Sequence, residues 1–79
     1  MYFLVNYDRQ SGQLISVRTF APDSREHADV ARLELEVTLN AQGVEREVVI
    51  LEAEDEASLR VNYRRYFENA LELLVPTPR

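Results

Sequence analysis

The chain contains no cysteine, so the sequence excludes disulfide bonds, thiolate zinc sites and cysteine nucleophiles. It contains no lysine and no tryptophan either, and all nine of its positive charges are arginine. Only two glycines and three prolines occur, which is too few for a linker or a low-complexity segment. The apolar run at residues 2–5 is far too short for a signal peptide or a membrane span. We therefore expect a cytoplasmic location and no membrane partner.

The residues that are present predict one small folded domain over residues 1–79. Apolar residues make up 46% of the chain and charged residues 29%, as in globular domains. A chain of this length buries only about 60% of the surface that it exposes when unfolded, so we expect marginal stability. Fourteen acidic residues give a formal charge of −5, which disfavours nucleic acid unless a basic face is concentrated somewhere on the surface.

The N-terminal third predicts a β-hairpin. Residues 2–7 and 14–20 are rich in aromatic and β-branched side chains, and the segment between them carries turn residues. Asp8 can bond the backbone of the turn, and Gly12 can adopt the positive φ that a loop of this length requires. The first strand is apolar on both faces and the second is not. We therefore expect the first strand at the centre of the sheet and the second nearer an edge.

The next segment fits two patterns. Asp23 and Glu26 form a capping-box signal for a helix, and apolar residues then recur at helical spacing. Residues 33–39 also alternate between apolar and polar, as a half-buried strand does. We favour a helix over residues 24–40, because alanine, leucine, glutamate and arginine are strong helix formers. The alternative is a helix that ends near Ala31, followed by a strand over residues 33–39.

The C-terminal half predicts one more strand and one more helix. Residues 44–53 include the apolar run 48–51, which is typical of a buried strand. Asp55 is then expected to cap a long helix that ends before Pro76. The apolar positions of this helix form one broad stripe, made up of Leu59, Tyr63, Tyr66, Phe67, Ala70, Leu73 and Leu74.

Together these elements predict an α+β fold of order ββαβα. We expect a two-layer sandwich in which two helices pack on a three-stranded, mainly antiparallel sheet of order 2-1-3. The alternative is a four-stranded sheet with a short first helix and a long C-terminal helix. Two helices on one face would leave the other apolar face open, and this surplus predicts a homodimer. The candidate interface consists of Val30, Leu33, Val37, Val48 and Ile50.

No group of residues predicts catalysis, a cofactor or a metal. His27 is the only histidine, and we expect it to be a solvated surface residue. The acidic residues between 52 and 56 are adjacent along the chain, whereas a cation site needs oxygens that converge on one point. A phosphate-binding loop, a nucleophile elbow and a zinc-protease motif are all missing from the sequence. We therefore expect a protein that is not an enzyme.

The most distinctive segment places Arg60, Arg64 and Arg65 among aromatic residues, a combination that nucleic-acid surfaces use. On a helix the aromatic residues would face the core, and Glu56 and Glu68 would lie four residues from Arg60 and Arg64. We expect a non-enzymatic protein–protein interaction module or accessory subunit that acts as a homodimer. The alternative function is a nucleic-acid-binding module that uses this candidate basic patch, and an acidic protein is an alternative partner for the same arginines.

Overall fold

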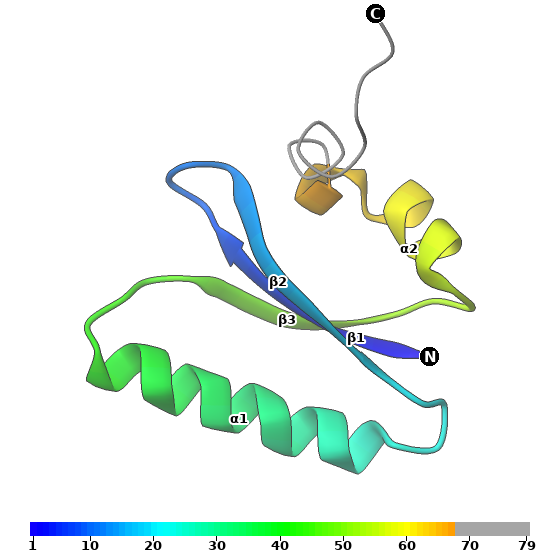
Figure 1. Cartoon of the computed structure of the whole chain (residues 1–79), viewed down its shortest axis with the longest axis horizontal. Helices are drawn as coiled ribbons and strands as arrows, with labels where there is room; N and C mark the ends of the chain where they lie inside the picture. Colours follow the sequence, from blue (N-terminus) through cyan, green and yellow to red (C-terminus); the bar gives the residue numbers. More distant parts are fainter. Residues whose placement is uncertain (68–79) are drawn as a thin grey trace, which may run out of the picture.

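The computed structural model describes residues 1–67 and contains the elements that the sequence predicts, in the predicted order (Figure 1). The α+β class and the order ββαβα are confirmed. The bounds are β1 Tyr2–Asp8, β2 Gln13–Phe20, α1 Arg25–Ala41, β3 Glu47–Glu52 and α2 Glu56–Asn62. Among the described residues no helix is long and apolar enough to cross a membrane.

The three strands form one sheet in the order β2-β1-β3, as predicted, and both strand pairs are antiparallel. β1 takes the centre because it is apolar on both faces, and the side chains of Phe3, Leu4 and Val5 are all buried. Since β2 and β3 flank the same strand, the connection through α1 crosses over β1. The apolar run on β3 therefore lies at an edge of the sheet, where its residues are half-buried rather than buried as the sequence predicts.

Each face of the sheet is covered by its own helical segment, so the molecule has three layers (Figure 1). α1 packs on the face that carries Leu4, and Ala28 and Ala31 supply the small side chains at that contact. α2 and the helical residues 64–67 pack on the face that carries Phe3 and Val5. The expectation of two helices on one face in a two-layer sandwich is wrong in this respect. Because β1 is apolar on both sides, each of its faces needs a separate cover.

The hairpin turn forms as predicted. The Asp8 carboxylate accepts hydrogen bonds from the Gln10 backbone N–H at 3.1 Å and from the Ser11 hydroxyl at 2.9 Å. The Gly12 N–H donates to the Asp8 carbonyl at 2.8 Å, and Gly12 has the positive φ of 70°. The register between β1 and β2 shifts after Asn6, which places a bulge in the edge strand β2.

Residues 33–39 belong to α1, so the favoured helix is confirmed and the four-stranded alternative is not. Ion pairs four residues apart, Arg25 with Asp29 and Arg32 with Glu36, support the helix on its surface. The predicted capping box is wrong. Ser24 is the N-cap residue, and its hydroxyl bonds to the Asp23 carboxylate rather than to a backbone N–H of the helix.

The last helical segment differs from the single long helix that the sequence predicts. Asp55 caps α2 as expected, and its carboxylate accepts the Ser58 N–H at 2.7 Å. α2 ends after seven residues, because Tyr63 leaves the helical region with φ −126° and ψ 53°. Residues 64–67 are helical again. Leu59, Tyr66 and Phe67 are buried as predicted, whereas Tyr63 is half-buried, and the predicted stripe positions at residues 70, 73 and 74 lie outside the described residues.

Candidate functional site

The outer face of α1 carries three aliphatic side chains in solvent. Val30, Leu33 and Val37 are 55%, 61% and 59% exposed, and they follow the spacing of one helix face. Ala28 and Ala31, by contrast, are buried against the sheet on the inner face of the same helix. We call Val30, Leu33 and Val37 the α1 stripe. The exposure of this part of the candidate interface agrees with the prediction.

The other part of the candidate interface lies elsewhere. Val48 and Ile50 are half-buried on the side of the sheet that α1 covers, and both pack against its core cluster. They are therefore separated from the α1 stripe by the thickness of the helix. The five predicted residues form two surfaces rather than one patch, because the outer and inner sides of α1 face in opposite directions.

The two edges of the sheet differ in character. β2 is an edge strand with a bulge, a positive charge at Arg18 and polar side chains at Ser16 and Thr19, all of which discourage pairing with another strand. β3 carries the unbroken aliphatic run 48–51 between Glu47 and Glu52, and its register with β1 is continuous. Within residues 1–67 no other strand pairs with the outer edge of β3. This edge consequently presents unpaired backbone groups flanked by aliphatic side chains.

The candidate basic patch is largely neutralised. Arg60 pairs with Glu56 at 2.8 Å, as expected, and its guanidinium lies 5.2 Å from the ring centre of Phe67. Arg65 pairs with Glu47 at 2.9 Å and lies over the ring of Tyr66 at 4.8 Å. Arg64 is exposed and makes no ion pair with any residue in the described range, and Glu68 lies outside that range. Two of the three guanidinium groups thus already have a carboxylate partner.

A polar cluster surrounds Glu47, and the sequence does not predict it. The Glu47 side chain is only 16% exposed. Its carboxylate forms ion pairs with Arg9 at 3.4 Å and Arg65 at 2.9 Å, and it accepts a hydrogen bond from the Tyr66 hydroxyl. Tyr66 also meets Tyr7 edge to face, with ring centres 5.1 Å apart. Burial, followed by the hydrogen bond from Tyr66 to Glu47, raises the pKa of Tyr66. No local spacing reveals this cluster, because its members come from the hairpin turn, the start of β3 and the last helical segment.

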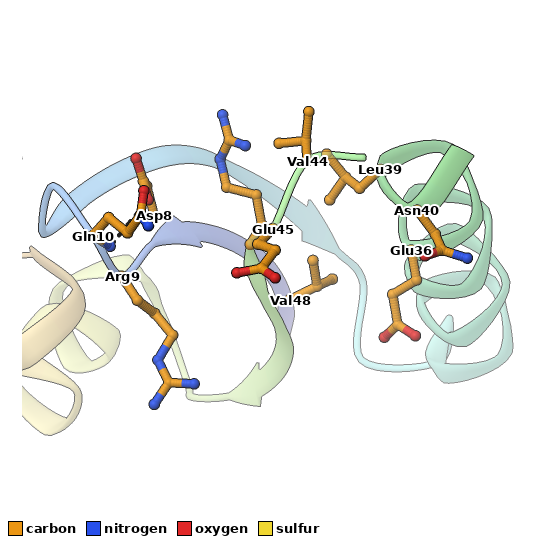
Figure 2. A pocket seen from close by; sticks show the side chains of 10 residues that line it. Asp8, Arg9, Gln10, Glu36, Leu39, Asn40, Val44, Glu45 and Val48 are labelled. Atoms are coloured by element: carbon orange, nitrogen blue, oxygen red, sulfur yellow. Dashed lines mark hydrogen bonds between the residues drawn. The ribbon is translucent and has the colours of Figure 1, made fainter. Parts of the chain in front are cut away.

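A pocket of about 410 Å³ opens between the hairpin turn, the C-terminal end of α1 and the start of β3 (Figure 2). Its walls mix carboxylates, among them Glu36 and Glu45, with the guanidinium groups of Arg9 and Arg46. Asp8 also lines it, but the turn uses that carboxylate, and the Ser11 hydroxyl bond lowers the pKa of Asp8 most strongly. Charges of both signs at this pocket do not select one class of ligand.

The remaining candidates form no site. His27 is exposed on the first turns of α1, as expected. In the described part of the chain no three histidine, cysteine, aspartate or glutamate residues gather so that they could hold a metal ion. No protein-family model matches the sequence, and no curated protein or solved structure matches the chain. The surfaces of α1 and β3 are therefore the best-defined functional candidates.

Proposed function

We propose that this chain is a non-enzymatic protein–protein interaction module that acts as a homodimer in the cytoplasm. The observation that carries the proposal is the open edge of β3, where four consecutive aliphatic residues border unpaired backbone groups. Natural edge strands are usually protected by a bulge, a charge within the strand or a proline, and residues 48–51 contain none of these. A second chain is the simplest cover for such an edge.

The α1 stripe gives the same module an apolar face for contact with another protein. Its three side chains lie on one side of the helix, and each is more than half exposed. A face of this kind is typical of helices that pack on a partner surface. The neutralised state of Arg60 and Arg65 supports protein contact over phosphate contact, because most nucleic-acid affinity comes from free positive charge.

The mass of the protein in solution tests the proposal. At about 100 μM, which is well above the micromolar dissociation constants of ordinary specific interfaces, light scattering should give twice the 9.2 kDa mass of the chain. A monomer at that concentration would refute the homodimer. The same sample should bind neither single-stranded nor duplex nucleic acid at low salt. Binding that weakens steeply as salt rises would instead support the arginine surface.

A further inference from the structure

We infer that two copies join by antiparallel pairing of β3 with β3, about a two-fold axis that passes beside Val49. The inference rests on the proposed homodimer and specifies how it is built. Pairing of this kind would convert two three-stranded sheets into one continuous six-stranded sheet. It would also place the two α1 helices side by side on the same face, because a two-fold axis perpendicular to a sheet keeps each face on its own side.

Hydrogen bonds at the end of the sheet show which backbone groups on β3 are free. Met1 and Ala53 exchange both of their backbone hydrogen bonds, at 2.9 Å and 3.1 Å. Bonded and non-bonded pairs alternate along an antiparallel ladder, and the register from Tyr2–Glu52 onward has no bulge. Leu51 and Val49 therefore bond to β1. Val48, Ile50 and Glu52 consequently direct their N–H and C=O groups outward, toward the open edge.

This alternation restricts the register of a β3–β3 pair. Two residues can exchange hydrogen bonds across the new interface only if both direct their backbone groups outward. Val48 opposite Ile50 of the second copy meets this condition, and it places Val49 opposite its own counterpart as a non-bonded pair. A shift by one residue would set an outward residue against an inward one. It would also bring Glu47 opposite Glu52, which places two like charges together.

The side chains favour the same register. When Val49 lies on the axis, Arg46 stands opposite Glu52 of the second copy, and symmetry repeats this pair at the other end. The Arg46 Nε is buried and finds no hydrogen-bond acceptor among residues 1–67. Glu52 is exposed and makes no ion pair with any of those residues. Glu52 would gain in the dimer the partner that it lacks among residues 1–67, and Arg46, whose charge acts on Asp8 within the chain, would gain a second carboxylate at the edge of the strand.

The flank of α1 above this edge is also self-complementary. Arg25, Asp29 and Arg32 line a groove of about 360 Å³ together with residues 48–50 of β3, and Glu36 continues the row along the helix. The charges run positive, negative, positive, negative. The two-fold axis reverses the row in the second copy. Arg25 of one copy then lies opposite Glu36 of the other, and Asp29 of one copy lies opposite Arg32 of the other. Strand spacing within the joined sheet would separate the two helix axes by about 10 Å, an ordinary packing distance.

Charge reversal tests the register. Arg46→Glu alone and Glu52→Arg alone should each raise the dissociation constant of the dimer at least about tenfold, because two attractive pairs become two repulsive pairs. The double variant R46E/E52R restores opposite charges at both ends and should dimerise nearly as well as the parent. Glu54→Arg is the matched control, because it reverses an exposed glutamate just beyond the strand. A double variant no better than the single variants would overturn this register.

A cysteine scan tests the axis without disturbing charge. The chain has no cysteine, so each variant carries a single thiol. Val49→Cys should form an intermolecular disulfide under mild oxidation, since Cα atoms of a non-bonded antiparallel pair are about 4.5 Å apart, which a disulfide can span. Val61→Cys, at a position that is 68% exposed on α2, should stay reduced. Leu33→Cys reports the competing dimer in which the two α1 stripes meet.

The outcomes separate this inference from the proposed function. A monomeric parent at about 100 μM overturns both. A dimeric parent that forms a disulfide at Leu33→Cys but not at Val49→Cys keeps the homodimer and overturns the β3 pairing. A dimeric parent with the Val49 disulfide and the charge-reversal rescue supports the inference. In that dimer the amide protons of Val48 and Ile50 should also exchange more slowly with solvent as protein concentration rises.

Discussion

Truncation of Phe67 to alanine should remove a large fraction of the stability of the fold. The Phe67 side chain is 1% exposed and packs in the cluster with Phe3, Val5 and Leu59. Loss of its burial costs about 1.5–3 kcal/mol, and the cavity left behind raises the total to about 3–5 kcal/mol. A 79-residue domain is stabilised by about 4–12 kcal/mol in all, so the variant should lose at least about a quarter of that stability.

Urea titrations followed by circular dichroism measure this loss, at one fixed protein concentration because dimerisation adds to apparent stability. The control is Val61→Ala, six residues away on the exposed side of α2, which should change stability by less than about 0.5 kcal/mol. The thermal midpoint of the Phe67→Ala variant should fall by at least about 12 °C, at about 4 °C per kcal/mol for a chain of this size. A fall of only a few degrees would refute the assignment of Phe67 to the core.

Four further predictions concern caps, turns and titrating groups. Asp55→Ala should lower the urea midpoint and Ser24→Ala should not, because only Asp55 bonds a helix N–H. The hydrogen bond from the Ser58 N–H lowers the pKa of Asp55, so the ionised Asp55 should stabilise the fold above about pH 4 and lose this effect as pH falls further. Acid titrations of the parent and of Asp55→Asn, compared with each other, measure this difference in stability. Gly43→Ala should cost about 1–2 kcal/mol in the same urea assay, since Gly43 has φ 68°, and Gly43→Asn should cost less. The pKa of Tyr66 is raised, so stability should fall above about pH 10, and Glu47→Gln should bring that pKa down in an ultraviolet titration of the tyrosines.

The strongest sequence signals were local ones. The turn at residues 8–12, the cap at Asp55 and the helix over residues 33–39 depend on contacts within a few residues, and each formed as predicted. Two local predictions failed. Ser24 took the N-cap position from Asp23, and Tyr63 interrupted the last helix. At Tyr63 the backbone leaves the helical region, and Tyr66 reaches the cluster around Glu47 just beyond this break. The helical periodicity of a sequence cannot reveal a contact between residues that lie far apart along the chain.

The candidate sites depended more heavily on distant contacts. The exposure of the α1 stripe followed from helical spacing alone, since a second apolar row on one helix cannot face the same sheet as the first. The sequence-based prediction placed this stripe in one interface with Val48 and Ile50, because the sequence does not show on which face of the sheet α1 packs. The Glu47 cluster joins residues from three separate segments, and no spacing along the chain predicts it.

The sequence by itself determined the order of the elements, the central position of β1 and the turns that join β1 to β2. A strand with apolar side chains on both faces must be buried on both sides, and the sequence of residues 2–7 shows this pattern. Only the tertiary structure decided that the two helical segments take opposite faces, which leaves no open face on β1 and leaves the edge of β3 and the α1 stripe as uncovered apolar features. The physical reason is that the side on which a helix packs depends on how the whole chain closes its core, whereas propensity, turns and alternation act over a few residues.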